Sequence, residues 1–468
     1  MVPEIALVDA RARTWDVIIA GSSFSAFFFL MGLPRDLSVL IVEKGGFADH
    51  AQQLETGIPG LESFRQTNTS GHPKEWVAHS TFGGNSNCWW ACTPRFHPSD
   101  FRMKTLYGVA QDWPISYDTL APYYDEVEAT MEISGGGSDH ILPRDTAFPF
   151  PPHLPSRTDQ YLRKTSRDWF AQPTARANGG SRALCCANGV CGLCPVDSKF
   201  TVINGIEAIT RPEVYRLMMS EVRATRVEGG RATGVVVKSA EGIAEIAAHT
   251  VALAANGIFN AAILLRSGIE LPGIGVGLNE QVSVRMGIDA DGMGPYGGTS
   301  ITGHGYPLYD GPFRSEHSGV LIEVYNAHAA IRPEYGKWLE RAHLKLIVED
   351  LPQDANTMTL EDDEPYLTWV GHHPYALKGL EWGRKRVSEM FEAPDRVFSS
   401  DLSVSEAHIM GTHRMGSDLK RDVVDAYHRC HGVPNLFVLG SGAFPSGSMA
   451  NPTLTLSAMA LRSAREAI

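Results

Sequence analysis

The chain has 468 residues, which exceeds one ordinary hydrophobic core and favours two lobes. A hydrophobic content of 43% with 20% charged residues is typical of a globular protein in water. The 41 Lys and Arg residues against 53 Asp and Glu residues leave a net charge of −12. This balance argues against a nucleic acid or an anionic membrane as the partner.

The N-terminal stretch has no basic region followed by an apolar core and a cleavage site, as a signal peptide would. Its apolar run is interrupted by Gly21, Ser22 and Ser23 and is too short to span a bilayer. We therefore expect no transmembrane segment and a cytoplasmic location. Export to the periplasm together with a signal-bearing partner is the alternative.

Residues 16–20 predict a short strand, which ends at Gly21 and leads into an apolar helix at 27–32. A second strand at 37–42 ends in Glu43, 22 residues after Gly21. This order is typical of the β-α-β dinucleotide unit, in which the acidic residue accepts the ribose hydroxyls and the helix N-terminus binds the phosphates. Ser23 and Ser25 interrupt the glycine-rich pattern, so an ordinary buried strand–turn–helix stays open as the alternative.

Two further apolar strands end in small residues in the same way. The strand at 250–257 turns at Asn256 and Gly257 into a predicted helix at 259–267, and the strand at 434–438 ends in Gly440, Ser441 and Gly442. Three strands that end in such turns indicate a flavin lying across the carboxyl edge of a parallel sheet.

The C-terminal sixty residues contain His408 and Asn451, 43 positions apart, each among glycine, proline and hydroxyl residues. An imidazole titrates near neutral pH and takes a proton, whereas a carboxamide holds a hydroxyl without taking its proton. The pair is therefore suited to deprotonating an alcohol while a hydride is removed. The alternatives are a core histidine and a turn asparagine before Pro452, and we expect structural roles for His413, His428 and His431.

Several segments together resemble the glucose–methanol–choline (GMC) oxidoreductase family of FAD-dependent alcohol oxidases and dehydrogenases. They are FGGNSNCWWACTP at 82–94, AANGIFNA at 254–261, GLN at 277–279, EDLPQDANT at 349–357, HIMGTHRMG at 408–416 and MANPTLT at 449–455. The form of the last segment resembles pyranose oxidases and bacterial FAD glucose dehydrogenases. The resemblance implies an α/β (α+β overall) fold, with a Rossmann-like FAD lobe built from discontinuous segments and an antiparallel-sheet substrate lobe.

The resemblance also implies roles for individual residues. His408 falls on the catalytic base position and Asn451 on the second catalytic position. Pyranose oxidases carry a histidine joined covalently to FAD where this chain has Cys88. We expect non-covalent FAD, with an S-linked flavin as the alternative. The residues expected to contact FAD are Gly21, Ser22, Ser23, Ser25, Ala26, Glu43, Gly83, Gly84, Ser86, Asn87, Cys88, Val222, Ala255, Gly257, Gly440, Ser441, Gly442 and Thr453.

Four of the seven cysteines, Cys185, Cys186, Cys191 and Cys194, lie within ten residues and are separated by small residues. This spacing is suited to wrapping an iron–sulfur cluster, and the resemblance to FAD glucose dehydrogenases implies a three-iron type. Zinc, disulfides and free thiols remain alternatives. A cluster would relay electrons to a cytochrome or a small subunit. We expect Cys88, Cys92 and Cys430 to be packing residues.

The predicted FAD-binding domain comprises residues 12–100, 199–285 and 405–468. The predicted substrate-binding domain is 286–404, with strands at 318–325 and 343–348 and a helix at 375–391, and 101–198 is a loop-rich insertion that holds the cysteines. Candidate residues lining the substrate pocket are Trp369, His372, His373 and Tyr375.

The sequence therefore predicts FAD-dependent oxidation of a sugar, glycoside or polyol CH–OH group. Electrons are expected to pass to an acceptor other than oxygen. An oxygen-reducing oxidase of the same family and a non-catalytic assembly subunit are the alternatives.

Overall fold

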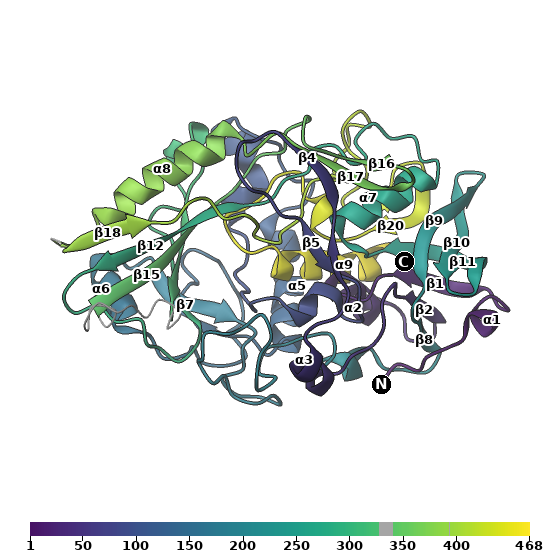
Figure 1. Cartoon of the computed structure of the whole chain (residues 1–468), viewed down its shortest axis with the longest axis horizontal. Helices are drawn as coiled ribbons and strands as arrows, with labels where there is room; N and C mark the ends of the chain where they lie inside the picture. The colour runs from purple at the N-terminus through teal and green to yellow at the C-terminus, as the bar shows by residue number, and fades with distance from the viewer. Residues whose placement is uncertain (327–339, 393) are drawn as a thin grey trace.

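The computed structural model describes residues 1–326, 340–392 and 394–468. Residues 327–339 and 393, which belong to the predicted substrate-binding domain, lie outside the described residues. An eight-stranded sheet lies toward the end of the molecule where both termini are found, and a seven-stranded sheet lies toward the other end (Figure 1). Helices α2, α5 and α9 occupy the space between them.

The eight-stranded sheet has a parallel centre in the order β20-β11-β1-β2-β8. Antiparallel strand β19 extends one edge, and the β9–β10 pair attaches to the long strand β11. The four strands predicted around Gly21, Glu43, Asn256 and Gly440 are confirmed. The strands are β1 (Trp15–Ala20), β2 (Val39–Val42), β8 (Val214–Leu217), β9 (Glu221–Glu228), β10 (Arg231–Ser239), β11 (Gly242–Leu253), β19 (Arg429–Cys430) and β20 (Val433–Val438).

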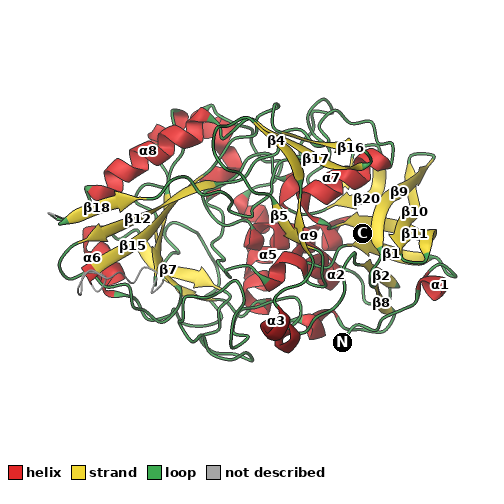
Figure 2. Cartoon of the chain, viewed as in Figure 1, coloured by secondary structure: helices red, strands yellow, loops and turns green. Residues whose placement is uncertain are grey.

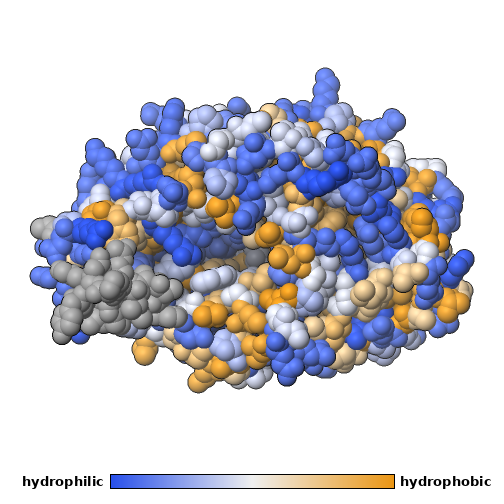
Figure 3. Space-filling view, viewed as in Figure 1, coloured by the Kyte–Doolittle hydropathy of each residue, from blue (hydrophilic) through white to orange (hydrophobic). Residues whose placement is uncertain are grey.

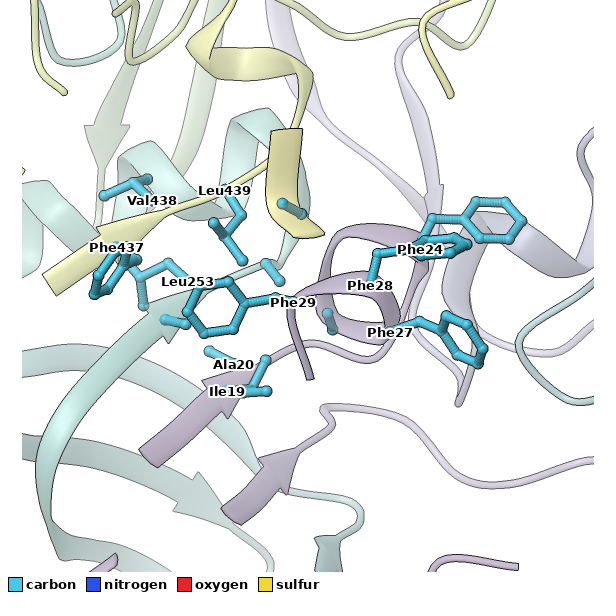
Figure 4. Packing of buried hydrophobic residues seen from close by; sticks show 14 of the residues in the cluster. Ile19, Ala20, Phe24, Phe27, Phe28, Phe29, Leu253, Phe437, Val438 and Leu439 are labelled. Atoms are coloured by element: carbon cyan, nitrogen blue, oxygen red, sulfur yellow. The ribbon is translucent and has the colours of Figure 1, made fainter. Parts of the chain in front are cut away.

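Helix α2 (Phe24–Gly32) follows β1 and begins three residues earlier than the sequence predicts. It is buried from Phe24 to Leu30, because β1 packs on one side of it and helix α9 (Thr453–Ala467) on the other. Phe29 of α2 contacts Phe437 of β20, with ring centroids 5.4 Å apart (Figure 4). A Cβ at Gly32 would lie 2.8 Å from Ala464 Cβ, so a glycine allows α2 and α9 to approach closely.

The seven-stranded sheet is antiparallel throughout, in the order β18-β12-β15-β14-β13-β7-β6, as the sequence predicts for the substrate lobe. Helix α8 (Pro374–Ser388) packs on β12 and β15. It ends three residues before the predicted end. The strands are β6 (Ser134–Gly136), β7 (Trp169–Thr174), β12 (Val282–Asp289), β13 (Ile301–Gly305), β14 (Leu321–Tyr325), β15 (Arg341–Val348) and β18 (Arg396–Ser399).

Strands β6 and β7 belong to segment 101–198, so this segment contributes to the seven-stranded sheet, and the predicted boundary at 285/286 falls inside β12. Two small sheets, β16-β17-β4 and β3-β5, complete the strands. The remaining elements are α1 (Leu7–Ala10), α3 (His50–Thr56), α4 (Met103–Tyr107), α5 (Tyr117–Thr130), α6 (Arg157–Thr165), α7 (Asn256–Arg266), β3 (Leu61–Ser63), β4 (Arg65–Asn68), β5 (Val77–His79), β16 (Thr357–Glu361) and β17 (Glu364–Trp369).

Helix α9 packs against α2 and α5 in the centre of the molecule, whereas α8 lies over the seven-stranded sheet (Figure 2). None of the helices in the described residues has the length and apolar character needed to cross a bilayer. On the face shown in Figure 3, hydrophilic residues cover most of the upper half and hydrophobic ones gather toward the lower centre.

Candidate active site

A cavity of about 500 Å³ is lined by residues of both large sheets. The eight-stranded sheet contributes the turns that follow β1, β2, β11 and β20. The seven-stranded sheet contributes side chains of β12, β13, β14 and β15. Segments 78–92, 405–409 and 451–456 close the remaining sides. The cavity thus joins the predicted nucleotide-binding turns to the predicted substrate lobe.

The nucleotide end of the cavity depends on Gly21, which has a φ of +95°. A Cβ at this position would lie 2.6 Å from the carbonyl oxygen of Ala254, so only glycine lets the turns after β1 and β11 meet. Ser22 Oγ donates to Glu43 Oε2 at 2.5 Å and accepts from the Gly83 amide at 2.9 Å. Ser23, the N-cap residue of α2, makes no side-chain capping hydrogen bond.

Glu43 ends β2 and is buried, and burial raises the pKa of its carboxyl group to about 7. Its acceptor oxygens face the first turn of the β-α-β unit, and the helix N-terminus beside it favours an anion. These features fit a dinucleotide, with its ribose at Glu43 and its phosphates at the start of α2.

Most of the residues expected to contact FAD line this cavity: Gly21, Ser22, Ser23, Ser25, Glu43, Gly84, Cys88, Val222, Ala255, Gly257, Gly440, Ser441 and Thr453. The remaining predicted contacts do not line it and instead support the wall. Ser86 Oγ accepts from the Val202 amide, and Asn87 Nδ2 donates to the Phe82 carbonyl. Ala26 is buried within α2, Gly83 binds Ser22, and Gly442 packs against His413.

His408 and Asn451 line the same cavity, as the sequence predicts. His408 Nδ1 lies 2.6 Å from Gln281 Oε1, and the His408 amide donates to Glu280 Oε2 at 3.2 Å. Desolvation lowers the pKa of His408 to about 4, so its imidazole is neutral at pH 7. Asn451 Oδ1 is buried and has no hydrogen-bond partner among the described residues, so the carboxamide can bind a ligand.

A row of polar side chains on the seven-stranded sheet was not predicted. Arg285 of β12 lies opposite Lys345 of β15, Lys345 lies opposite Glu323 of β14, and Glu323 lies opposite His304 of β13. Directly opposite residues in antiparallel strands share one face, and Arg285, Lys345 and Glu323 line the cavity. The sequence signal is a charged residue inside an otherwise apolar strand.

The charges of this row are tied to neighbours. Lys345 Nζ forms an ion pair with Glu406. Although burial opposes it, the Lys345 charge and hydrogen bond lower the pKa of Glu406 to about 2. Glu323 lies 3.4 Å from His304 Nε2 and accepts from the Tyr325 hydroxyl at 3.1 Å. The substrate side of the cavity therefore offers fixed donors and acceptors.

The prediction that Trp369, His372, His373 and Tyr375 line the substrate pocket is wrong. Trp369 packs against Trp76, and His372 Nδ1 lies 2.7 Å from Asp350 Oδ2. His373 Nδ1 accepts from the Tyr375 amide and caps α8, whereas the Tyr375 hydroxyl donates to the Arg314 carbonyl. These side chains are satisfied by internal partners away from the cavity lining.

The other C-terminal histidines have structural partners, as expected. His413 is buried beside Thr412, with burial lowering its pKa to about 3. His428 Nδ1 contacts Ser463 Oγ at 2.8 Å, and burial lowers its pKa to about 4. His431 Nε2 contacts the Gly416 carbonyl.

The four clustered cysteines have separate neighbours. Cys185 Sγ lies 3.5 Å from Thr299 Oγ1, Cys191 Sγ lies 3.0 Å from Ser300 Oγ, and Cys194 Sγ accepts from the Ser198 amide. Cys186 is exposed.

Across residues 1–326, 340–392 and 394–468, no three His, Cys, Asp or Glu side chains are grouped to hold a metal ion. The arrangement therefore gives the predicted iron–sulfur cluster no support. All seven cysteines are free thiols. Cys430 is buried as expected, whereas Cys88 and Cys92 line the cavity.

Comparisons with known proteins agree with this geometry. The GMC oxidoreductase family profile matches residues 352–460. The fructose dehydrogenase large subunit of Gluconobacter japonicus is 26% identical, with 96% of this chain and 97% of that protein covered. The 6'''-hydroxyparomomycin C oxidase of Streptomyces lividus is 27% identical over 97% of this chain and 91% of its own length.

The fold is similar to that of pyridoxine 4-oxidase from Mesorbium loti, with a TM-score of 0.69 and 19% identity. That likeness covers 97% of this chain and 99% of the other. The dinucleotide turns, the two sheets and the shared cavity define a flavin-dependent oxidoreductase. The family match at residues 352–460, together with relatives that cover nearly the whole chain, indicates an FAD-dependent oxidoreductase of the GMC type.

Proposed function

We propose that the protein oxidises the CH–OH group of a sugar, glycoside or polyol, with His408 as the base and Asn451 as the hydroxyl anchor. The observation that carries this proposal is that both side chains line the cavity that also contains the dinucleotide-binding turns. Bound FAD supplies the hydride acceptor for this reaction.

The alcohol loses two hydrogens, a proton from oxygen and a hydride from carbon, and becomes a carbonyl compound. A neutral His408 takes the proton on Nε2, for which the lowered pKa keeps a free lone pair at pH 7. Asn451 Nδ2 donates to the substrate oxygen and stabilises the negative charge that develops as the proton leaves. Asn451 Oδ1 has no partner among the described residues and can accept from another hydroxyl of the ligand.

The polar row supports a substrate with several hydroxyl groups. Glu323 offers acceptor oxygens, and Lys345 and Arg285 offer donors, while a sugar hydroxyl both donates and accepts. The similar Gluconobacter protein is by its name a fructose dehydrogenase subunit, and the Streptomyces protein is an oxidase of hydroxyparomomycin C. Both names fit a substrate of the carbohydrate class.

We further propose an acceptor other than oxygen and a partner subunit. The Gluconobacter relative, named as a dehydrogenase large subunit, supports both, whereas the Streptomyces relative, named as an oxidase, favours oxygen. Assays of peroxide formation in air and of dye reduction without air separate the two acceptors.

The substrate class is tested by mixing the flavin-loaded protein with sugars, aminoglycosides and polyols without oxygen and recording flavin bleaching. Rapid bleaching by a carbohydrate supports the proposal. Absence of bleaching by every alcohol, with FAD fully bound, would reject it. Purified protein without visible flavin absorbance would favour a non-catalytic role.

A further inference from the structure

Gln281 contacts His408 but does not itself line the cavity. It follows Asn279 and Glu280, immediately before β12, and is 1% exposed. Its side chain makes three hydrogen bonds. Oε1 lies 2.6 Å from His408 Nδ1, and Nε2 donates to the carbonyl oxygens of Ser448 at 2.5 Å and Ala450 at 2.8 Å.

The orientation of this amide follows from its partners. Two backbone carbonyls can only accept, so the nitrogen of the Gln281 carboxamide must face Ser448 and Ala450. Its oxygen must then face His408 Nδ1. Because that oxygen can only accept, His408 Nδ1 must carry the hydrogen, and a neutral imidazole then has its lone pair on Nε2.

The two carbonyls are themselves held in place. Ser448 Oγ donates to Asp100 Oδ2 at 2.8 Å and accepts from the Ala450 amide at 3.0 Å. Asp100 is fully buried and binds Arg314 Nη2 at 2.9 Å and the Tyr309 hydroxyl at 2.7 Å. A buried ionic network therefore fixes segment 448–450, and Asn451 is the next residue.

We propose that Gln281 is a positioning residue that holds His408 in the Nδ1-protonated tautomer and in register with Asn451. The inference deepens the proposed function, on which its catalytic meaning rests. Gln281 does not line the cavity. It acts because its oxygen selects the tautomer of the base, while its nitrogen binds the segment that presents the anchor.

Two substitutions separate the two roles of Gln281, as the acceptor for His408 Nδ1 and as the donor to the carbonyls of Ser448 and Ala450. Gln281→Glu keeps an acceptor for His408 Nδ1 but loses both donors to the carbonyls. Gln281→Leu removes the acceptor and the donors together. The matched control is Gln53→Leu, since Gln53 is also buried and donates to a carbonyl, that of Ala48, but does not line the cavity.

The tautomer is read directly from the ¹⁵N resonances of histidine-labelled protein, assigned to His408 by comparison with His408→Asn. We expect a protonated Nδ1 and an unprotonated Nε2 in the wild-type protein, in Gln281→Glu and in Gln53→Leu. In Gln281→Leu we expect loss of the preference for Nδ1. A wild-type His408 protonated on Nε2, or an unchanged tautomer in Gln281→Leu, would overturn the inference.

The pH profile of flavin reduction gives a second readout. In Gln281→Glu, the new carboxylate stabilises the imidazolium, so the acid limb should move upward by about 1–3 pH units. In Gln281→Leu, we expect a loss of about 10²–10⁴-fold, because a base in the wrong tautomer cannot take the proton. An unmoved acid limb in Gln281→Glu would count against the positioning role of Gln281, even if Gln281→Leu failed to fold.

The tautomer is measured without substrate, so this test is distinct from that of the proposed function. If no alcohol bleached the flavin while His408 showed the expected tautomer, the proposed function would fail and the positioning role of Gln281 would stand. If an alcohol bleached the flavin but His408 were protonated on Nε2, the proposed function would stand and the positioning role of Gln281 would fail.

Discussion

Glu406 precedes His408 by two residues and forms a buried ion pair with Lys345. The side chains are 4% and 15% exposed, so the pair is largely removed from water. Glu406 Oε1 also accepts from Ser283 Oγ, and the Glu406 amide donates to Glu280 Oε1. The ion pair therefore fastens segment 405–408 to β15 of the substrate sheet.

We expect Lys345→Met to destabilise the folded protein by about 3–5 kcal/mol, because it leaves the Glu406 carboxylate unpaired in a buried position. The double variant Lys345→Met with Glu406→Gln should recover most of this loss, since no charge then stays unpaired. Urea unfolding of the three proteins measures the difference. Equal stability of the single and double variants would show that the pair is not coupled.

Substitution of His408 tests the base directly. We expect His408→Ala to lower the rate of flavin reduction by about 10²–10⁴-fold while FAD stays bound, because the alcohol proton has no acceptor. Anaerobic stopped-flow measures the rate, and visible absorbance measures retained flavin. The control is His140→Ala, a half-exposed histidine outside the cavity lining. A normal rate in His408→Ala would exclude His408 as the base.

Asn451→Asp should slow flavin reduction strongly, since a carboxylate repels the negative charge that develops on the substrate oxygen. The change is nearly isosteric, so FAD binding and thermal stability should be little altered. Asn178→Asp is the control, because Asn178 binds two backbone carbonyls at the surface away from the cavity lining. Reduction kinetics identical to those of the wild type would reject the anchor role.

Buried histidines make the fold sensitive to acid. Burial lowers the pKa of His153 and His428 to about 4 and that of His413 to about 3, from 6.5. The unfolded chain protonates these groups first as the pH falls. Their contribution to stability is therefore complete above about pH 6.5 and is lost as the pH falls toward 4.

Each such histidine adds about 1 kcal/mol per pH unit to the slope of stability between these pH values. We expect the melting temperature to fall steeply between pH 6.5 and 4.5. In His428→Gln the melting temperature should fall less steeply with pH, because one buried histidine no longer contributes to the slope. A melting temperature independent of pH in this range would contradict the assignment.

The number of titratable thiols after unfolding and the iron content per chain test the iron–sulfur cluster predicted at Cys185, Cys186, Cys191 and Cys194. Less than one iron per chain would reject that cluster. Thiol titration and metal analysis of protein made in iron-supplied cells measure both quantities. About three or four irons per chain, with a broad brown absorbance, would instead establish a cluster.

The nucleotide lobe could be predicted from the sequence because its signals are local. Gly21, Glu43 and the turn at Asn256 each lie at the end of an apolar strand, and parallel strands place their ends at one edge. The pairing of His408 with Asn451 was predictable only through motif similarity. Nothing in the local sequence places two residues 43 positions apart in one cavity.

The substrate wall could not be predicted because it depends on register. Lys345 and Glu323 become neighbours only when β14 and β15 pair with that alignment, and a slip of one residue between the strands would place the two side chains on opposite faces. The prediction that side chains within 369–375 line the substrate pocket was wrong for a related reason. Their aromatic and imidazole groups resemble a pocket in sequence, but their hydrogen-bond partners lie in distant segments.

The polar row on the substrate sheet has a practical consequence for protein engineering. Its members come from separate strands, with Arg285, Lys345 and Glu323 each at one position of a continuous ladder. The dinucleotide turns are on the other sheet. A combinatorial library at Arg285 and Glu323, with Lys345 kept because it pairs with Glu406, would thus vary the substrate wall without touching the dinucleotide turns.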